Sequence, residues 1–154
     1  MANSIQRDLK DSRYRFAYDL VAEVAAIRGD TSQLPPNLPA PDIILFTQQH
    51  AKWMEDFLVH DCQARTLDMW INENGTSSLE SLMEVCKGQY IAESSSTFCQ
   101  EQEFILACAK IAYIAAYFFK KRRIPGARNK ALEFIHKWIL SSPPRFIISL
   151  SHLR

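Results

Sequence analysis

Residues 104–119 read FILACAKIAYIAAYFF and form the most hydrophobic stretch of this 154-residue chain. Their apolar side chains surround the axis of a helix almost completely, and such a helix has to be enclosed by neighbouring elements. Lys110 interrupts the stretch near its middle, so we expect a buried helix rather than a membrane span of roughly 18 uninterrupted apolar residues. The helix is expected to end at Lys121, where the basic run 120–123 interacts favourably with its dipole. This stretch predicts the central helix of an all-α domain.

Helix start and stop signals divide the chain into about seven predicted helices. Gly29 ends the first helix, and four prolines in residues 35–41 make the following segment extended. Asp42 is the expected N-cap of the second helix, which then carries Leu45 and Phe46. No stretch of five residues alternates convincingly with the period of a strand, and no internal repeat occurs. The predicted helices span residues 5–28, 42–60, 64–72, 78–92, 100–121 and 128–140, with a last short apolar piece at 146–153.

Two stretches have the spacing of a capping box, in which a Ser or Thr and a Glu or Gln three residues later satisfy backbone N–H groups at a helix start. Ser77 and Glu80 form the first pair, and Thr97 and Gln100 form the second. The two pairs predict the starts of the fourth helix and of the central helix.

The composition excludes several classes of function. Lys plus Arg total 18 against 17 Asp plus Glu, so the chain lacks the basic excess typical of nucleic-acid binding. Only four glycines occur, which argues against the glycine-rich phosphate loops of Rossmann and P-loop enzymes. The N-terminal residues are polar and do not resemble a signal peptide, which favours a cytosolic protein.

The cysteines and histidines predict no metal or cofactor site. No two cysteines have the gap of a zinc knuckle, and the four histidines are scattered. We therefore expect reduced thiols that serve as small apolar side chains. The four cysteines are Cys62, Cys86, Cys99 and Cys108.

Several local motifs, in this order, resemble the B-cell lymphoma two (Bcl) family of apoptosis regulators. Residues 72–121 resemble homology region one followed by the hydrophobic hairpin. They contain Asn74-Gly75, then a predicted helix, a short loop and an apolar helix that ends in aromatic and basic residues. Residues 124–138 stand where the family has region two, and residues 13–29 resemble region four.

Other positions depart from the family pattern. Residues 47–58 give a weak version of region three, with Glu55 where that region has a small residue. Residues 77–80 read Ser-Ser-Leu-Glu where region one has Asn-Trp-Gly-Arg, so Glu80 replaces the arginine that meets a ligand aspartate. The region-two tryptophan is replaced by Ala131, and no membrane anchor follows the last helix. Short, divergent and anchorless chains are typical of the virus-encoded members.

The resemblance implies one Bcl-like domain over residues 1–154, with about seven or eight helices around a hydrophobic hairpin. It implies a non-enzymatic inhibitor of apoptosis that holds pro-apoptotic amphipathic helices in a hydrophobic groove. Glu80 would narrow the choice of ligand unless Lys52, Arg65 or Lys87 substitutes for the missing arginine. Ordinary core packing is the competing interpretation of every apolar residue in this set. The expected groove residues are Phe57, Leu58, Leu67, Trp70, Ile71, Ser77, Glu80, Leu82 and Met83.

The resemblance also implies the partners, which are proteins with a death-motif helix, such as Bim, and also Bak or Bax. We expect the chain in the host cytoplasm or at the periphery of the mitochondrial outer membrane, and an apolar tail makes a homodimer an open alternative. The basic run 120–123 is either a solvated helix end or a site for anionic lipid.

Two other functions stay open at this point. The first is a Bcl-fold signalling-adaptor decoy with a closed groove. The second is a helical-bundle metal enzyme, for which Glu133 and His136 supply one Glu-x-x-His motif without a second copy.

Overall fold

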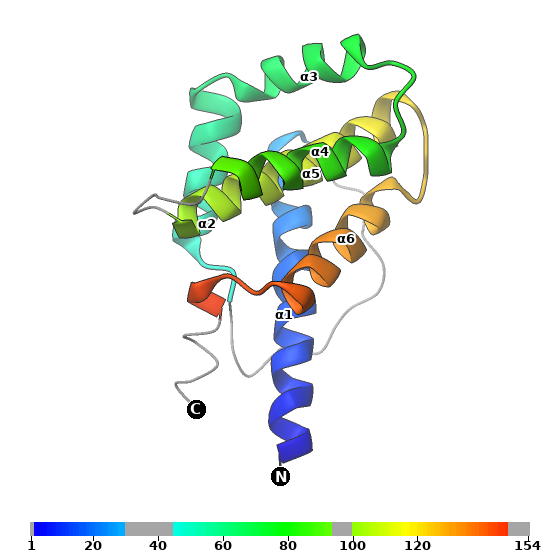
Figure 1. Cartoon of the computed structure of the whole chain (residues 1–154). Coiled ribbons are helices and arrows are strands. Elements are labelled where there is room, and N and C mark those ends of the chain that lie inside the picture. Colours follow the sequence, from blue (N-terminus) through cyan, green and yellow to red (C-terminus); the bar gives the residue numbers. More distant parts are fainter. Residues whose placement is uncertain (1, 30–44, 94–99, 148–154) are drawn as a thin grey trace.

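The computed structural model describes residues 2–29, 45–93 and 100–147, with side chains from Ser12 onward, and this part of the chain is all-helical. Figure 1 shows the helices in chain order. The described elements are α1 (Ala2–Ile27), α2 (Gln48–Glu55), the π-helix η1 (Asp56–His60), α3 (Gln63–Glu73), α4 (Leu79–Glu93), α5 (Gln100–Lys121) and α6 (Ala127–Ser141).

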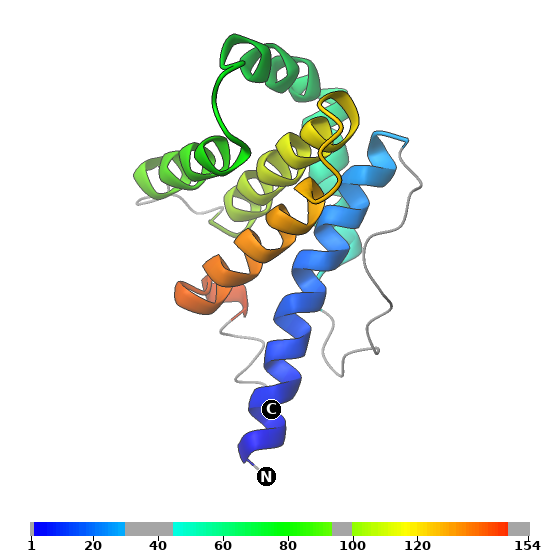
Figure 2. The same ribbon diagram turned by 90° about the vertical axis from the view of Figure 1, so that its right-hand side faces the viewer.

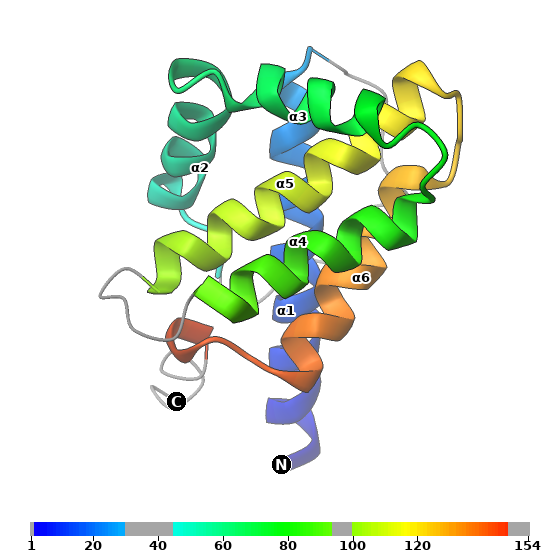
Figure 3. The ribbon, with the colours of Figure 1, turned by 45° about the horizontal axis from the view of Figure 1, so that its top comes forward.

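The central helix is α5, as predicted. It packs against α1, α2, α3, α4 and α6, which together cover most of its surface (Figure 3). Almost every side chain from Phe104 to Phe118 is buried, with Leu106 and Lys110 the partly exposed members. The length and composition of α5 would allow it to cross a membrane, but 72% of its apolar window is buried inside the structure.

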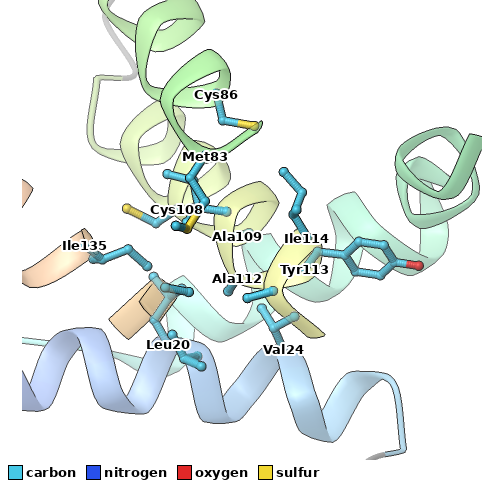
Figure 4. Close-up of a cluster of buried hydrophobic side chains, with 14 of the residues drawn as sticks. Leu20, Val24, Met83, Cys86, Cys108, Ala109, Ala112, Tyr113, Ile114 and Ile135 are labelled. Atoms are coloured by element: carbon cyan, nitrogen blue, oxygen red, sulfur yellow. The ribbon is translucent and has the colours of Figure 1, made fainter. Parts of the chain in front are cut away.

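The helices share one hydrophobic core around α5. α6 returns alongside α5 as the second arm of a hairpin, and α1 packs against both (Figure 2). In Figure 4, Leu20 of α1, Met83 of α4 and Ile135 of α6 converge on the small residues Cys108 and Ala112 of α5. Small side chains on α5 let the neighbouring helices approach closely, which explains why alanine recurs along its sequence.

The helix predicted to begin at Asp42 begins instead at Gln48, so the placement of Leu45 and Phe46 inside it was wrong. Thr47 is the N-cap: its Oγ1 accepts the backbone N–H of His50 at 3.3 Å, and its own N–H donates to His50 Nδ1 at 3.1 Å. This reciprocal pair satisfies two backbone donors and ends the extended approach to the helix.

The capping box predicted at Ser77 and Glu80 was also wrong, by one residue. Ser78 is the N-cap of α4, because its Oγ accepts the backbone N–H of Ser81 at 3.1 Å. The Ser77 N–H donates to the Asn74 carbonyl at 2.9 Å within the preceding turn, which leaves the neighbouring serine to start the helix.

The other predicted boundaries agree with the structure to within three residues. Gly29 follows α1 with φ of +80°, a left-handed conformation that favours glycine at a helix end. Residues 145–147 are helical, as expected for the start of the last apolar piece. The proline-rich loop, Asp42, the cap at Thr97, Cys99 and residues 148–154 lie outside the described part of the chain.

Candidate functional site

A cleft of about 150 Å³ opens over the first half of α5, between η1 and the second half of α4. α4 packs on α5 and α6, whereas η1 packs on α2 and α3, so the two walls belong to separate parts of the bundle (Figure 3). The floor and walls consist of Phe57, Cys86, Gln89, Tyr90, Glu93, Glu103, Leu106, Ala107 and Lys110.

The cleft residues of α4 and α5 lie on one face of each helix. On α4 they are residues 86, 89, 90 and 93, and on α5 residues 103, 106, 107 and 110. Both sets follow the spacing i, i+3, i+4 and i+7 that places side chains on a single helical face. Two such faces side by side form a trough rather than an isolated hole.

Lys110 is the single cation among the residues that line this trough. Its Nζ lies 5.7 Å from the centre of the Phe57 ring, a cation–π contact of about 0.5–2 kcal/mol. Glu93 and Glu103 line the same cleft from the ends of their helices. The site therefore combines an apolar floor with a partly buried cation and two carboxylates.

The thiol of Cys86 lies in the wall of the cleft but is chemically quiet. Burial raises the pKa of Cys86 to about 11, and the charge of Lys110 opposes this rise only in part. The thiol is therefore protonated at neutral pH, and only the thiolate is a good nucleophile. Cys108 is fully buried in α5, and burial raises its pKa well above the usual range. Cys62, by contrast, is exposed, so the expected apolar role does not apply to it.

Within the described ranges, no three His, Cys, Asp or Glu side chains gather as a metal site. His136 of the single Glu-x-x-His motif stands edge-on to the Tyr14 ring at 5.2 Å between ring centres, and Glu133 is exposed. Among residues 12–29, 45–93 and 100–147, no further acidic or histidine ligands join this motif to make a di-metal site.

Of the nine groove residues expected from the resemblance, only Phe57 lines the cleft. Trp70 is half-buried against the core and Ser77 is partly exposed. The other apolar members are buried in the core, at 7% exposure or less. They are Leu58, Leu67, Ile71, Leu82 and Met83.

Glu80 lies away from the cleft, on the exposed side of α4. Its carboxylate pairs with Lys130 of α6 at 2.9 Å, and the hydrogen bond from Lys130 lowers the pKa of Glu80. Lys87, one of the expected substitute cations, lies over the Phe134 and Trp138 rings of α6. Lys52 and Arg65 are exposed on α2 and α3 and do not line the cleft.

Lys110 was missed as a site residue, although the sequence carries its signal. It is the single charged residue in 104–119, and sequence reasoning used it only against a membrane span. A single cation on an otherwise apolar helix indicates either that the neighbouring helices leave this position open to solvent or that the charge has a partner.

Beyond Lys110, α3 covers the continuation of the same α5 face. Tyr113 OH donates to Asp68 Oδ1 at 2.7 Å, and Tyr117 OH donates to Asn72 Oδ1 at 2.5 Å. Arg28, just beyond α1, adds a 3.8 Å contact to Asp68. Burial and the hydrogen bond to Asp68 raise the pKa of Tyr113, so the phenol stays protonated and keeps donating.

No family model matches the chain, and neither a curated protein nor a solved structure matches it.

Proposed function

We propose that this chain inhibits apoptosis by holding an amphipathic helix of a pro-apoptotic protein in the cleft between η1, α4 and α5. The observation that carries the proposal is the trough of two helical faces with Lys110 in its lining. A groove of this kind takes a helix by its apolar anchors at i, i+3 or i+4, and i+7. The motifs that resemble the Bcl family support the same function.

Lys110 is the residue that we propose to select the ligand. A ligand helix with an acidic residue among its apolar anchors would pair with this cation and exchange the cation–π contact with Phe57 for a charged hydrogen bond. Removing one member of such a pair at an interface typically costs about 2–5 kcal/mol. In this proposal Lys110, rather than Lys52, Arg65 or Lys87, replaces the arginine that the family motif would supply.

The cleft has to widen to hold a whole helix. Its volume of about 150 Å³ is below the roughly 300–1,000 Å³ of ordinary ligand pockets. α3 is the element whose release would lengthen the trough, because it covers the α5 face beyond Lys110.

The partners in this proposal are proteins with a death-motif helix, such as Bim, with Bak or Bax as further candidates. The setting is the host cytoplasm, with the mitochondrial outer membrane as the surface where such ligands act. The degenerate motifs fit a divergent virus-encoded protein that binds few ligands. The apolar C-terminal tail leaves homodimerisation as an alternative.

Calorimetric titration of the full chain against a panel of pro-apoptotic helix peptides tests the proposal. The cleft variant is Leu106→Glu, and the matched control is Val85→Glu on the exposed side of α4. We expect tight binding to one or a few peptides, lost in Leu106→Glu and kept in Val85→Glu. A folded protein that binds none of the peptides would contradict the proposal.

The second candidate function is a signalling-adaptor decoy with a closed groove. It is favoured by the small cleft volume and by the two tyrosine hydrogen bonds that fasten α3. The double variant Tyr113→Phe/Tyr117→Phe separates the two functions. If the trough is a latent groove, freeing α3 strengthens peptide binding, whereas an adaptor stays unable to bind the peptides.

A further inference from the structure

The end of α5 and the turn that follows it carry four consecutive cations followed by two exposed non-polar residues. We call residues 120–125, Lys-Lys-Arg-Arg-Ile-Pro, the basic turn. Lys120, Lys121 and Arg123 are exposed, and none of them has an ion pair among the described residues. Arg122 lies over the Phe118 ring at 4.3 Å, and Ile124 is 36% exposed.

The charge around the basic turn is one-sided. No Asp or Glu occurs between Glu103 and Glu133, a stretch that holds seven cations. Glu80, which reaches this hairpin from α4, is already paired with Lys130. Without the four cations of the basic turn, the chain has 14 basic and 17 acidic residues, so these four cations turn a slightly acidic chain into one with a net charge of +1.

Arg123 adds an independent observation, because its backbone is left-handed with φ of +56°. This conformation is unfavourable for residues with a Cβ atom, and glycine or asparagine usually occupies it. An arginine at such a position therefore destabilises the backbone relative to glycine. Residues held in strained conformations are often found at functional sites, and here the strained residue is a cation.

We propose that the basic turn docks the protein on an anionic phospholipid surface. The four cations would lie among the lipid headgroups, with Ile124 at the boundary of the acyl chains. A flat membrane meets only this end of the molecule. A nucleic acid would extend along the flanking surface, where the acidic excess of the remaining chain repels it.

Each cation near an anionic membrane strengthens binding by about five-fold, and salt weakens the interaction because these side chains are exposed. The association is therefore peripheral, reversible and dependent on salt. It does not involve the cleft, so it stands or falls separately from the proposed helix binding.

Co-sedimentation of the full chain with vesicles tests the inference. The vesicles contain three parts phosphatidylcholine to one part phosphatidylserine, compared with phosphatidylcholine alone at low and at high salt. We expect binding to the anionic vesicles only, lost at high salt. Equal binding to both lipids, or tighter binding to a short nucleic-acid duplex than to the anionic vesicles, would overturn the proposal.

Variants locate the contact. Lys120→Ala/Lys121→Ala should reduce the affinity by about 25-fold from the five-fold contribution of each cation. The control Lys52→Ala/Arg65→Ala removes two exposed cations on α2 and α3. It should change the affinity for the anionic vesicles by no more than about two-fold, because these charges lie away from the membrane. An equal loss in both pairs would mean that net charge alone drives binding and would reject the basic turn as the site.

Arg123→Gly separates a role in binding from a role in folding. Relief of the left-handed conformation should raise the melting temperature by about 2–4 °C. The same variant should lose about five-fold in affinity for the anionic vesicles. A variant with a lower melting temperature, or with unchanged vesicle binding, would contradict the assignment.

Discussion

At the scale of single residues, the side chain of His50 contacts several elements of the bundle. The ring is 2% exposed and packs among Phe16, Phe46, Trp53 and Phe146. Because Nδ1 accepts the Thr47 N–H, the neutral ring carries its proton on Nε2, which donates to Glu101 at 2.6 Å. One imidazole therefore caps α2 and ties it to α5.

His50→Phe keeps the ring packing but removes both hydrogen bonds of the imidazole. We expect a loss of about 1–3 kcal/mol in the free energy of unfolding, because the Thr47 N–H and the Glu101 carboxylate lose their partner. Urea unfolding measures the change, with the exposed neighbour Gln49→Phe as the matched control. Equal effects of the two variants would show that the hydrogen bonds do not matter.

Cys86 leads to a prediction about pH. Because burial raises its pKa from about 9 in the unfolded chain to about 11, the folded state keeps a proton that the unfolded state loses. Stability is therefore unaffected below pH 9 and falls as the pH rises toward 11, by on the order of 2–3 kcal/mol for this group. Unfolding curves across this range should show a shallower decline for Cys86→Ala than for the original chain. Identical slopes would contradict the role of this thiol.

At the scale of elements, capping determines where helices begin. α2 and α4 both start at hydroxyl N-caps, Thr47 and Ser78, rather than at the residues that pattern alone favours. Ser77 and Ser78 are adjacent, and either could be the N-cap by residue type. The Ser77 N–H is bonded to Asn74 within the preceding turn, and Ser78 is the residue that caps α4.

Ser78→Ala should destabilise the protein by about 0.5–2 kcal/mol, because the Ser81 N–H loses its acceptor. Ser77→Ala is the matched control and should change the free energy of unfolding by less than about 0.5 kcal/mol, as for an ordinary surface substitution. Chemical denaturation compares the two. A larger effect of Ser77→Ala would restore the capping box at Ser77 and Glu80.

At the scale of the whole molecule, α5 is the element that α1, α2, α3, α4 and α6 all contact. It packs on five of the other helices, and its small residues let α1, α4 and α6 approach from different sides. The folded state is therefore expected to unfold as one cooperative unit.

Ile111→Ala tests this cooperativity, because Ile111 is fully buried on α5. We expect a loss of about 2–5 kcal/mol from the cavity and the lost burial. Hydrogen exchange should speed up in α1 and α6 together, whereas Met69→Ala, at an exposed site on α3, should leave both unchanged. Faster exchange confined to α5 would contradict a single cooperative core.

Most helices could be predicted from the sequence because their signals are local. Apolar spacing, Gly29, Pro125-Gly126 and Pro143-Pro144 act within a few residues, and five of the six described α-helices follow them with shifts of at most three residues. The start of α2 moved by six residues, because the decisive cap, Thr47 with His50, depends on a ring that is positioned by packing against α1.

The sequence by itself determined that the described part of the chain is all-helical and that its most hydrophobic helix is central, because periodicity and helix-ending residues are properties of neighbouring positions. Only the tertiary structure decided which apolar residues line a cleft. Leu82, Met83 and Cys86 all lie on the apolar side of α4 and all are buried, yet Cys86 also lines the cleft, whereas Leu82 and Met83 pack only into the core. The spacing of apolar residues specifies a helical face but not the element that covers it. Here α3 covers the α5 face at Tyr113 and Tyr117, whereas Lys110 on the same face lines the cleft.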